Sequence, residues 1–329
     1  MKKLNRRIVR WLLLLAVLGV SMLPQILGQT RHGRRHTPAA TMAASTQHPK
    51  FQLDCTLPAL TSQPLAIDKK CGLEGDSSGD SAKQNEVKNR FCLPGAPTEP
   101  SKLEFTTFDT LQQTAEQHHI PFGRKTLPDG TSQEQLPPDR SLLVDLITGG
   151  QGQSLGEGSL VTLEGFVFKA QHSNVSSGES VNCHTKGLMG NDIHIALAET
   201  KVGAKAATHG TKNEIQAAEC ETVTAEITPH HRSAIYNRFD TNPADFLNGA
   251  AQQPKKDKLK GHPLPLQSAR VRMTGQLFFD GSHSPCINGH GGPPRRSIWE
   301  IHPVFAIEVF ETTQNKFIPF EEWAQLHSH

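Results

Sequence analysis

Five segments in the second half of the chain alternate between apolar and polar residues, and this pattern limits the fold more than any other feature. A period of two is typical of β-strands, whose side chains point alternately to the two faces of a sheet. A helical segment of about residues 233–248, broken near Pro243, separates the first three from the last two. The alternating segments are residues 160–170, 191–199, 220–228, 269–280 and 297–311. The chain therefore predicts three strands, a helix and two strands.

This β-β-β-α-β-β order resembles that of the OB-fold, a five-stranded Greek-key barrel. The resemblance covers roughly residues 158–312 and lies in the order and length of the elements. Gly165 and Gly275 would suit the sharp coiling of a small barrel, because glycines in strands permit bends. The strings NDIHIAL, VRMTGQLFFD and WEIHPVFAIEV also resemble parts of exported bacterial proteins of unknown role. We expect a mainly β protein with some helix; a small β-sandwich or an open antiparallel sheet is the alternative.

Alternation also divides the strand residues between an apolar and a polar face. The apolar face can fill the barrel, and the polar face covers its outside. In an OB-fold the outer face of strands two and three usually binds the ligand. The residues predicted to point inward are Val161, Leu163, Gly165, Val167, Ile193, Ile195, Val223, Ala225, Ile227, Val271, Met273, Leu277, Trp299, Ile301 and Pro303.

The predicted outer face collects carboxylates and histidines from neighbouring strands. Asp192 and His194 are two residues apart, as are Glu300 and His302, so each pair shares one face of its strand. Glu226 has the same orientation on the third strand. The predicted ligand-binding set is Asp192, His194, Glu226, Arg272, Glu300 and His302.

Part of this set could hold a divalent metal such as Zn, Mn or Fe, because imidazole and carboxylate suit these ions. The predicted ligands are Asp192, His194, Glu226 and His302. A bound metal could activate water for hydrolysis or hold a ligand. The alternative is an ordinary polar face, since the solvated side of a sheet is polar by default. In that case His302 would be a half-buried histidine that Glu226 or Thr228 satisfies.

Six cysteines, three in each half, predict disulfides in an oxidising compartment. They are Cys55, Cys71, Cys92, Cys183, Cys220 and Cys286. Fifteen pairings are possible, and the sequence does not choose among them. Cys286 lies in the long loop 279–296, and a bond to Cys183 would anchor that loop. Metal binding by His283, Cys286 and His290 is the alternative for this loop.

The N-terminus predicts export. Basic residues within the first ten positions precede an uncharged apolar stretch, Trp11 to Val20, which is typical of a secretory signal peptide. That stretch is shorter than the roughly 20 residues that span a bilayer. An uncleaved anchor is the alternative, and it is the only membrane contact that we expect. The signal is assigned to residues 1–30, with its cleavage site left open.

The rest of the chain divides into four parts. We expect a flexible linker at residues 31–50, then a Cys-containing, partly helical region at 51–150 with helices near 83–92 and 104–119. The OB-like barrel follows at 151–315, and a C-terminal tail at 316–329 could form a closing helix.

Composition and missing motifs narrow the function. The net charge is only +2, and the signal supplies much of the positive charge, so we expect no nucleic-acid partner. The sequence has no G-x-S-x-G elbow and no phosphate-binding glycine loop. We expect a periplasmic or extracellular protein that binds an unknown ligand or envelope protein, and is not an enzyme. The alternatives are a metal-dependent hydrolase of a phosphoester or glycan, and an envelope scaffold.

Overall fold

The computed structural model describes residues 67, 71–90, 99–150, 152–230, 232–247, 259, 263–287, 289 and 292–328. All of them belong to one compact unit, Thr46–His329. The predicted signal peptide, the linker at 31–50, Cys55 and Cys92 lie outside the described residues. Among the helices that are described, none is long and apolar enough to cross a membrane.

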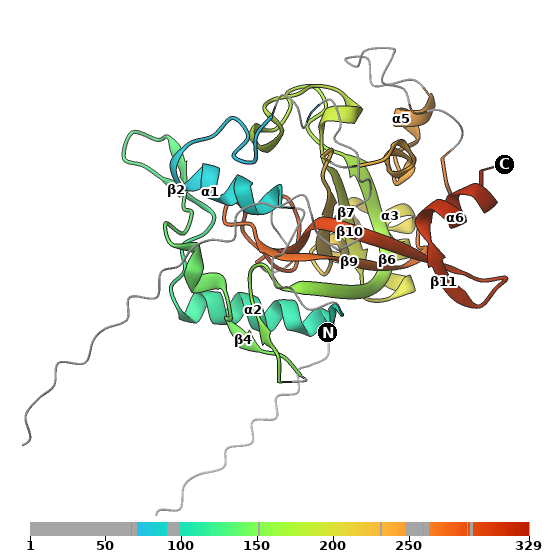
Figure 1. The fold of residues 1–329 in the computed structure, drawn as a ribbon, viewed down its shortest axis with the longest axis horizontal. Coiled ribbons are helices and arrows are strands. Elements are labelled where there is room, and N and C mark those ends of the chain that lie inside the picture. The colour runs from blue at the N-terminus through green and yellow to red at the C-terminus, as the bar shows by residue number, and fades with distance from the viewer. Residues whose placement is uncertain are drawn as a thin grey trace, which may run out of the picture. The chain divides into compact units, whose positions relative to one another are not determined.

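Five strands close into a barrel (Figure 1). Around the barrel the order is β6 (Leu160–His172), β7 (Ile193–Ala198), β8 (Val223–Ile227), β10 (Trp299–Glu311) and β9 (Arg270–Phe279), which returns to β6. All neighbours are antiparallel except β8 and β10, which run parallel. The predicted five-stranded barrel is confirmed as a closed mixed barrel, and its strand order is compatible with the OB-like arrangement.

Two glycines permit the close approach of strands that this closure requires. Residues 160–166 of β6 pair with β9, and residues 166–172 pair with β7. At Gly165, where the change occurs, a Cβ atom would lie 3.1 Å from the carbonyl oxygen of Ala198. At Gly275 in β9 a Cβ atom would lie 2.5 Å from the carbonyl oxygen of Pro303. Both glycines therefore have the role that the sequence predicts.

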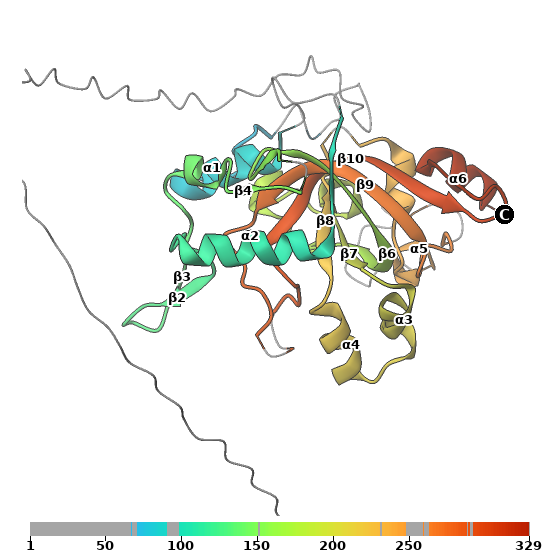
Figure 2. The same cartoon turned by 90° about the horizontal axis from the view of Figure 1, so that it is seen from below.

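The apolar faces of the strands fill the barrel as predicted, and the residues predicted to point inward, apart from Gly165 and Pro303, belong to one buried hydrophobic cluster. The helix predicted near 104–119 is α2 (Phe105–Gln117), which adds Phe108 and Leu111 to that cluster. Helix α6 (Phe320–Leu326) adds Phe320. The two helices lie at opposite ends of the barrel (Figure 2). The barrel and the region before it thus share one core.

Two connections differ from the sequence-based expectation. Between β7 and β8 the chain forms two helices, α3 (Lys201–His209) and α4 (Lys212–Glu219), each begun by a threonine cap. The helix expected near 233–248 is instead a 3₁₀ turn, η4 (Ala234–Arg238), followed by the short α5 (Pro243–Leu247). Proline fits the first turn of a helix but not its interior, which explains the break.

The flanking regions hold more structure than the sequence suggests. The C-terminal segment begins as a strand, β11 (Lys316–Pro319), which pairs with the end of β10 before α6 starts. The helix expected at 83–92 is α1 (Gly79–Lys88), and β1 (Ser101–Leu103) pairs with β6 in parallel. The remaining elements are β2 (Arg124–Thr126), β3 (Ser132–Glu134), η1 (Arg140–Leu143), β4 (Ile147–Thr148), β5 (Ser154–Leu155), η2 (Ser180–Asn182) and η3 (Leu188–Gly190).

Among the described cysteines, two disulfides connect distant segments: Cys71 with Cys183, 112 residues apart, and Cys220 with Cys286, 66 residues apart. The predicted bond between Cys286 and Cys183 is wrong. The loop after β9 lies along the start of β8, because the Arg296 amide donates to the Thr222 carbonyl, and this brings Cys286 to Cys220. Disulfides between distant segments are typical of proteins that fold in an oxidising compartment.

Candidate functional site

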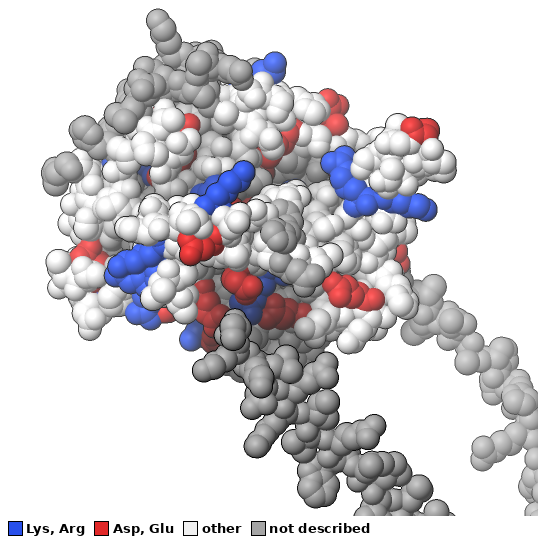
Figure 3. Space-filling model, turned by 180° about the vertical axis from the view of Figure 1, so that it is seen from behind, with Lys and Arg blue, Asp and Glu red and all other residues white. Residues whose placement is uncertain are grey.

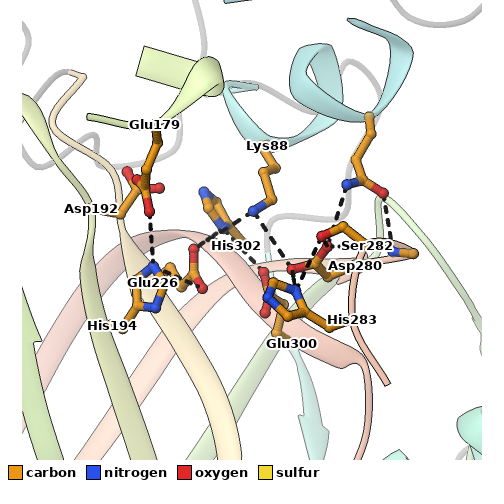
Figure 4. A network of polar contacts seen from close by, with 12 residues as sticks. Lys88, Glu179, Asp192, His194, Glu226, Asp280, Ser282, His283, Glu300 and His302 are labelled. Carbon is orange, nitrogen blue, oxygen red and sulfur yellow. Dashed lines mark hydrogen bonds and ion pairs between the residues drawn. The ribbon is translucent and has the colours of Figure 1, made fainter. Parts of the chain in front are cut away.

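Strand register brings the two predicted histidines to one carboxylate. His194 and Glu226 are cross-strand partners on β7 and β8, and β10 runs beside β8 with Ile301 opposite Ala225. One carboxylate oxygen of Glu226 is 3.4 Å from Nε2 of His194, and the other is 2.9 Å from Nδ1 of His302. Glu226 therefore bridges both histidines (Figure 4).

Asp192 joins the same group from the residue that precedes β7. Its Oδ1 accepts a hydrogen bond of 3.2 Å from Asn182, which also donates to Glu179 at 3.2 Å. The ligand atoms of Asp192, Glu226 and His302 lie within 4.8 Å of one another, and those of Glu179, Asp192 and His194 do as well. Two overlapping groups of metal-type ligands thus share Asp192.

A second set of charged groups lies on the β9 and β10 side of His302 (Figure 4). Oε1 of Glu300 is 3.2 Å from Nδ1 of His302, and its Oε2 accepts from Arg295 at 3.0 Å. Asp280, which follows β9, is 2.6 Å from Nδ1 of His283 and 3.7 Å from Nη1 of Arg295. Glu300 therefore connects His302 to a neighbouring Asp–His pair through Arg295.

Lys88, the last residue of α1, joins the two sides from above the barrel. Its Nζ lies 3.9 Å from Oε2 of Glu226 and 3.7 Å from Oδ2 of Asp280. We call the whole assembly the buried charge cluster. Its members are Lys88, Glu179, Asp192, His194, Glu226, Asp280, His283, Arg295, Glu300 and His302.

The expectation that this face of the barrel is solvated is wrong. Asp192, Glu226, Glu300 and His302 are at most 1 % exposed. The cover comes from α1, where the Val87 carbonyl accepts from Gln276 of β9. Within the buried charge cluster, His194 and His283 keep the largest exposed fractions, at 30 % and 27 % of the side chain. These two imidazoles mark where the cluster reaches solvent.

The protonation equilibria reflect a strongly negative interior. Burial raises the pKa of Asp192 to about 7, and the carboxylate of Glu179 adds to the effect. Burial alone would lower the pKa of His302, but the charge of Glu226 outweighs it and raises the pKa to about 10. The same balance raises the pKa of His194 to about 9. The carboxylates also raise the pKa of Lys88 against the effect of its burial.

Protonated histidines offset most of the excess negative charge of the cluster, while some of its buried polar atoms lack a hydrogen-bond partner. The cluster holds five carboxylates and two permanent cations, and the raised pKa values of His194 and His302 favour two protonated imidazoles in addition. Oδ2 of Asp192 and Nε2 of His302 are buried without a hydrogen-bond partner. Carboxylates hold Nδ1 of His302, and the other ring nitrogen points toward Asp192 (Figure 4). Histidines that bind metals are oriented in this way.

Arg272, predicted with this set, lies elsewhere in the structure. Its Nη1 is 3.1 Å from Glu308, and its guanidinium lies 4.0 Å from the ring centre of Phe317. On β9 it pairs with Glu308, whereas Phe278 pairs with Glu300 beside the cluster. Alternation predicts the face of a residue but not its height along the barrel.

Lys88, Glu179, Asp280, His283 and Arg295 belong to the site, but sequence reasoning did not include them in the predicted set. Four of them lie in loops or turns, and Lys88 ends a helix far away in the sequence. Only Asp280 and His283 gave a signal, since Asp280 ends a predicted strand and His283 was named as a possible metal ligand in the loop 279–296.

On the molecular face seen in Figure 3, Lys and Arg side chains are interspersed with Asp and Glu. For the described residues, this face presents no field of a single sign that would steer a charged partner. Comparisons of the chain with protein-family models, with curated proteins and with solved structures found no match. The buried charge cluster and the surfaces around it are therefore the features that bear on its function.

Proposed function

We propose that this is an exported binding protein whose barrel holds a divalent cation such as Zn, Mn or Fe. The supporting observation is the pair of overlapping ligand groups that share Asp192, each with its ligand atoms within 4.8 Å. Zinc ligands lie about 2.0–2.2 Å from the ion, so donors in one tetrahedral shell are about 3.4 Å apart. Small side-chain adjustments would bring these groups to that spacing. The four ligands are Asp192, His194, Glu226 and His302, and Glu179 lies beside them, 3.6 Å from Nε2 of His194.

Electrostatics favour the same proposal. A buried excess of carboxylates costs free energy unless protons or a cation neutralise it. The site mixes imidazole and carboxylate donors. This mixture favours Zn, Mn or Fe, whereas a site with oxygen donors alone would favour Mg or Ca. The two disulfides and the basic, apolar N-terminus support a periplasmic or extracellular location.

Elemental analysis of protein purified without chelators or a histidine tag tests this directly. We expect about one equivalent of Zn, Mn or Fe. Titration calorimetry with ZnCl₂ on chelator-treated protein should show one tight site. Asp192→Asn and His302→Gln keep the size of each side chain but remove a ligand atom, and each should weaken Zn binding at least tenfold.

Two matched variants control for general effects of losing a charge or an imidazole. His283→Gln removes a histidine of the same buried charge cluster that lies outside both ligand groups. Asp129→Asn removes an exposed turn carboxylate. Both should bind Zn like the unaltered chain. Absence of metal at every stage, or equal affinity in Asp192→Asn and Asp129→Asn, would exclude the metal site.

A metal-dependent hydrolase of a phosphoester or glycan is the second candidate. His194 and His283 are partly exposed, and each contacts a buried carboxylate, as a general base does. Hydrolysis of bis-p-nitrophenyl phosphate and p-nitrophenyl glycosides, assayed with added metal, tests this reading. His283→Gln should then lose activity while it keeps its metal. No turnover above the metal-only blank would leave the binding function alone.

A further inference from the structure

A cavity of different character lies between α3 and α6, lined by none of the residues of the buried charge cluster. Its volume is about 620 Å³. Sites for small organic molecules typically measure about 300–1,000 Å³ and combine an apolar lining with a few polar groups. The walls come from α3, from the segment before β9, from the end of β10 and from α6.

One side of the cavity is aromatic. Phe166 of β6, Phe310 of β10 and Trp323 of α6 line it. Trp323 is only 4 % exposed and contacts the ring of His327 in a tilted arrangement, with ring centres 4.4 Å apart, so it is held in place. Such rings offer a flat apolar surface to a planar ligand.

The lining also carries cationic side chains on α3. Lys201, Lys205 and His209 of α3 line the cavity at intervals of four residues, which places them on one face of the helix. Neither Lys201 nor Lys205 forms an ion pair with any described carboxylate. The two lysines therefore leave positive charge available at the cavity.

The acidic residue in the lining, Glu311, does not cancel this charge. Its carboxylate accepts hydrogen bonds from the amide and hydroxyl of Thr313, at 2.9 and 2.7 Å. Its other oxygen is 2.7 Å from Nε2 of His327. These contacts hold the pKa of Glu311 at about 2, with the hydrogen bond from His327 as the largest cause. Its single negative charge therefore stays on the wall formed by β10 and α6, and the two lysines of α3 outnumber it.

We propose that this cavity binds a small organic anion with a flat apolar body. The carboxylate or sulfonate of such a ligand would lie between Lys201 and Lys205, and its ring would lie against Phe166 and Phe310. Charge complementarity and aromatic lining select this class over neutral or cationic molecules. The site is independent of the metal proposal, because the two share no residue.

Titration calorimetry of the full chain with 1-naphthoate and with 1-naphthamide, a neutral molecule of the same ring and similar size, tests the proposal. We expect 1-naphthoate to bind more tightly and to weaken as salt rises. The double variant Lys201→Ala, Lys205→Ala should lose roughly tenfold in affinity for 1-naphthoate and bind both molecules alike. Both lysines are exposed helix residues, and alanine favours helix, so folding should be preserved.

Lys212→Ala, an exposed lysine of α4 outside the cavity, is the matched control and should bind like the unaltered chain. Asp192→Asn should also leave 1-naphthoate binding unchanged, which separates this site from the metal site. Equal affinity for the two molecules, no binding of either, or an unchanged affinity in the double lysine variant would overturn the proposal.

Discussion

Glu226 shows how this molecule tolerates a fully buried carboxylate. A buried charge is costly unless opposite charges and hydrogen bonds surround it. Glu226 lies among His194, His302 and Lys88, and their charges hold its pKa well below the ordinary value although burial acts to raise it. Removing one of these partners should therefore cost more than the loss of a surface ion pair.

Lys88→Met is expected to lower the free energy of unfolding by roughly 3–5 kcal/mol, because it leaves buried carboxylates without their shared cation. Urea unfolding followed by circular dichroism measures the change. Lys83→Met is the control, since Lys83 on the same helix makes an exposed pair with Asp80 worth at most about 1 kcal/mol. If both variants are equally stable, the carboxylates of Glu226 and Asp280 are neutralised by other means.

A separate acidic pair lies near α5. Nδ1 of His172 is 2.6 Å from Asp240, and Asn242 donates to Asp245 at 3.2 Å. Burial raises the pKa of Asp245 to about 7, and its interaction with Asp240 adds to the effect. The folded state therefore binds a proton that the unfolded chain releases near pH 4. Its stabilising contribution is present below about pH 4 and is lost as pH rises through 7.

Asp245→Asn should remove this part of the pH dependence. We expect the variant to match the unaltered chain near pH 4 and to be more stable at pH 7.5 by a few kcal/mol at most. Chelator-treated protein, unfolded by urea at the two pH values, gives the comparison. A variant that is less stable at pH 7.5 would mean that the ionised Asp245 carboxylate contributes favourably to the fold.

At the scale of elements, α1 owes its position over the barrel partly to a crosslink. The Cys71–Cys183 disulfide joins the segment before α1 to the turn that follows Glu179. Gln84 of α1 donates to Asp280, and Val87 accepts from Gln276, so polar contacts also hold the helix down. The disulfide therefore helps to keep the buried charge cluster covered.

Replacing both cysteines, Cys71→Ser with Cys183→Ser, should speed amide hydrogen exchange across α1 while the barrel strands stay protected. Mass spectrometry of deuterium uptake resolves the two regions. The other pair, Cys220→Ser with Cys286→Ser, crosslinks the end of α4 to the β9–β10 loop and should leave α1 exchange unchanged. Unaltered protection of α1 in the first variant would assign its position to polar contacts alone.

The strands were predictable because their pattern is local. Alternation over short windows predicted the barrel strands and their inward faces, from Val161 to Ile301. The same alternation predicted that His194, Glu226 and His302 share one face of the barrel. Helices α3 and α4 were missed. They are short, at 9 and 8 residues, and together they bury only Ala204.

At the scale of the whole molecule, the sequence did not predict that other segments cover the charged face of the barrel. Burial of the charged face depends on α1, on the turn at Glu179 and on the loop that holds Arg295, and these meet only through tertiary packing. No local sequence pattern predicts these tertiary contacts. The sequence therefore predicted which residues share the barrel face but treated that face as solvated.

The parallel pairing of β8 with β10 has a consequence for how the protein is made. β10 follows the other four barrel strands along the chain and hydrogen-bonds to both β8 and β9, so the barrel closes only after β10 has been made. Until then β8 and β9 have open edges, which can pair with other chains. A nascent chain that stops before Trp299 also leaves Glu226 without His302. Ribosomal synthesis must thus extend past β10 before either the barrel or its charge cluster can form.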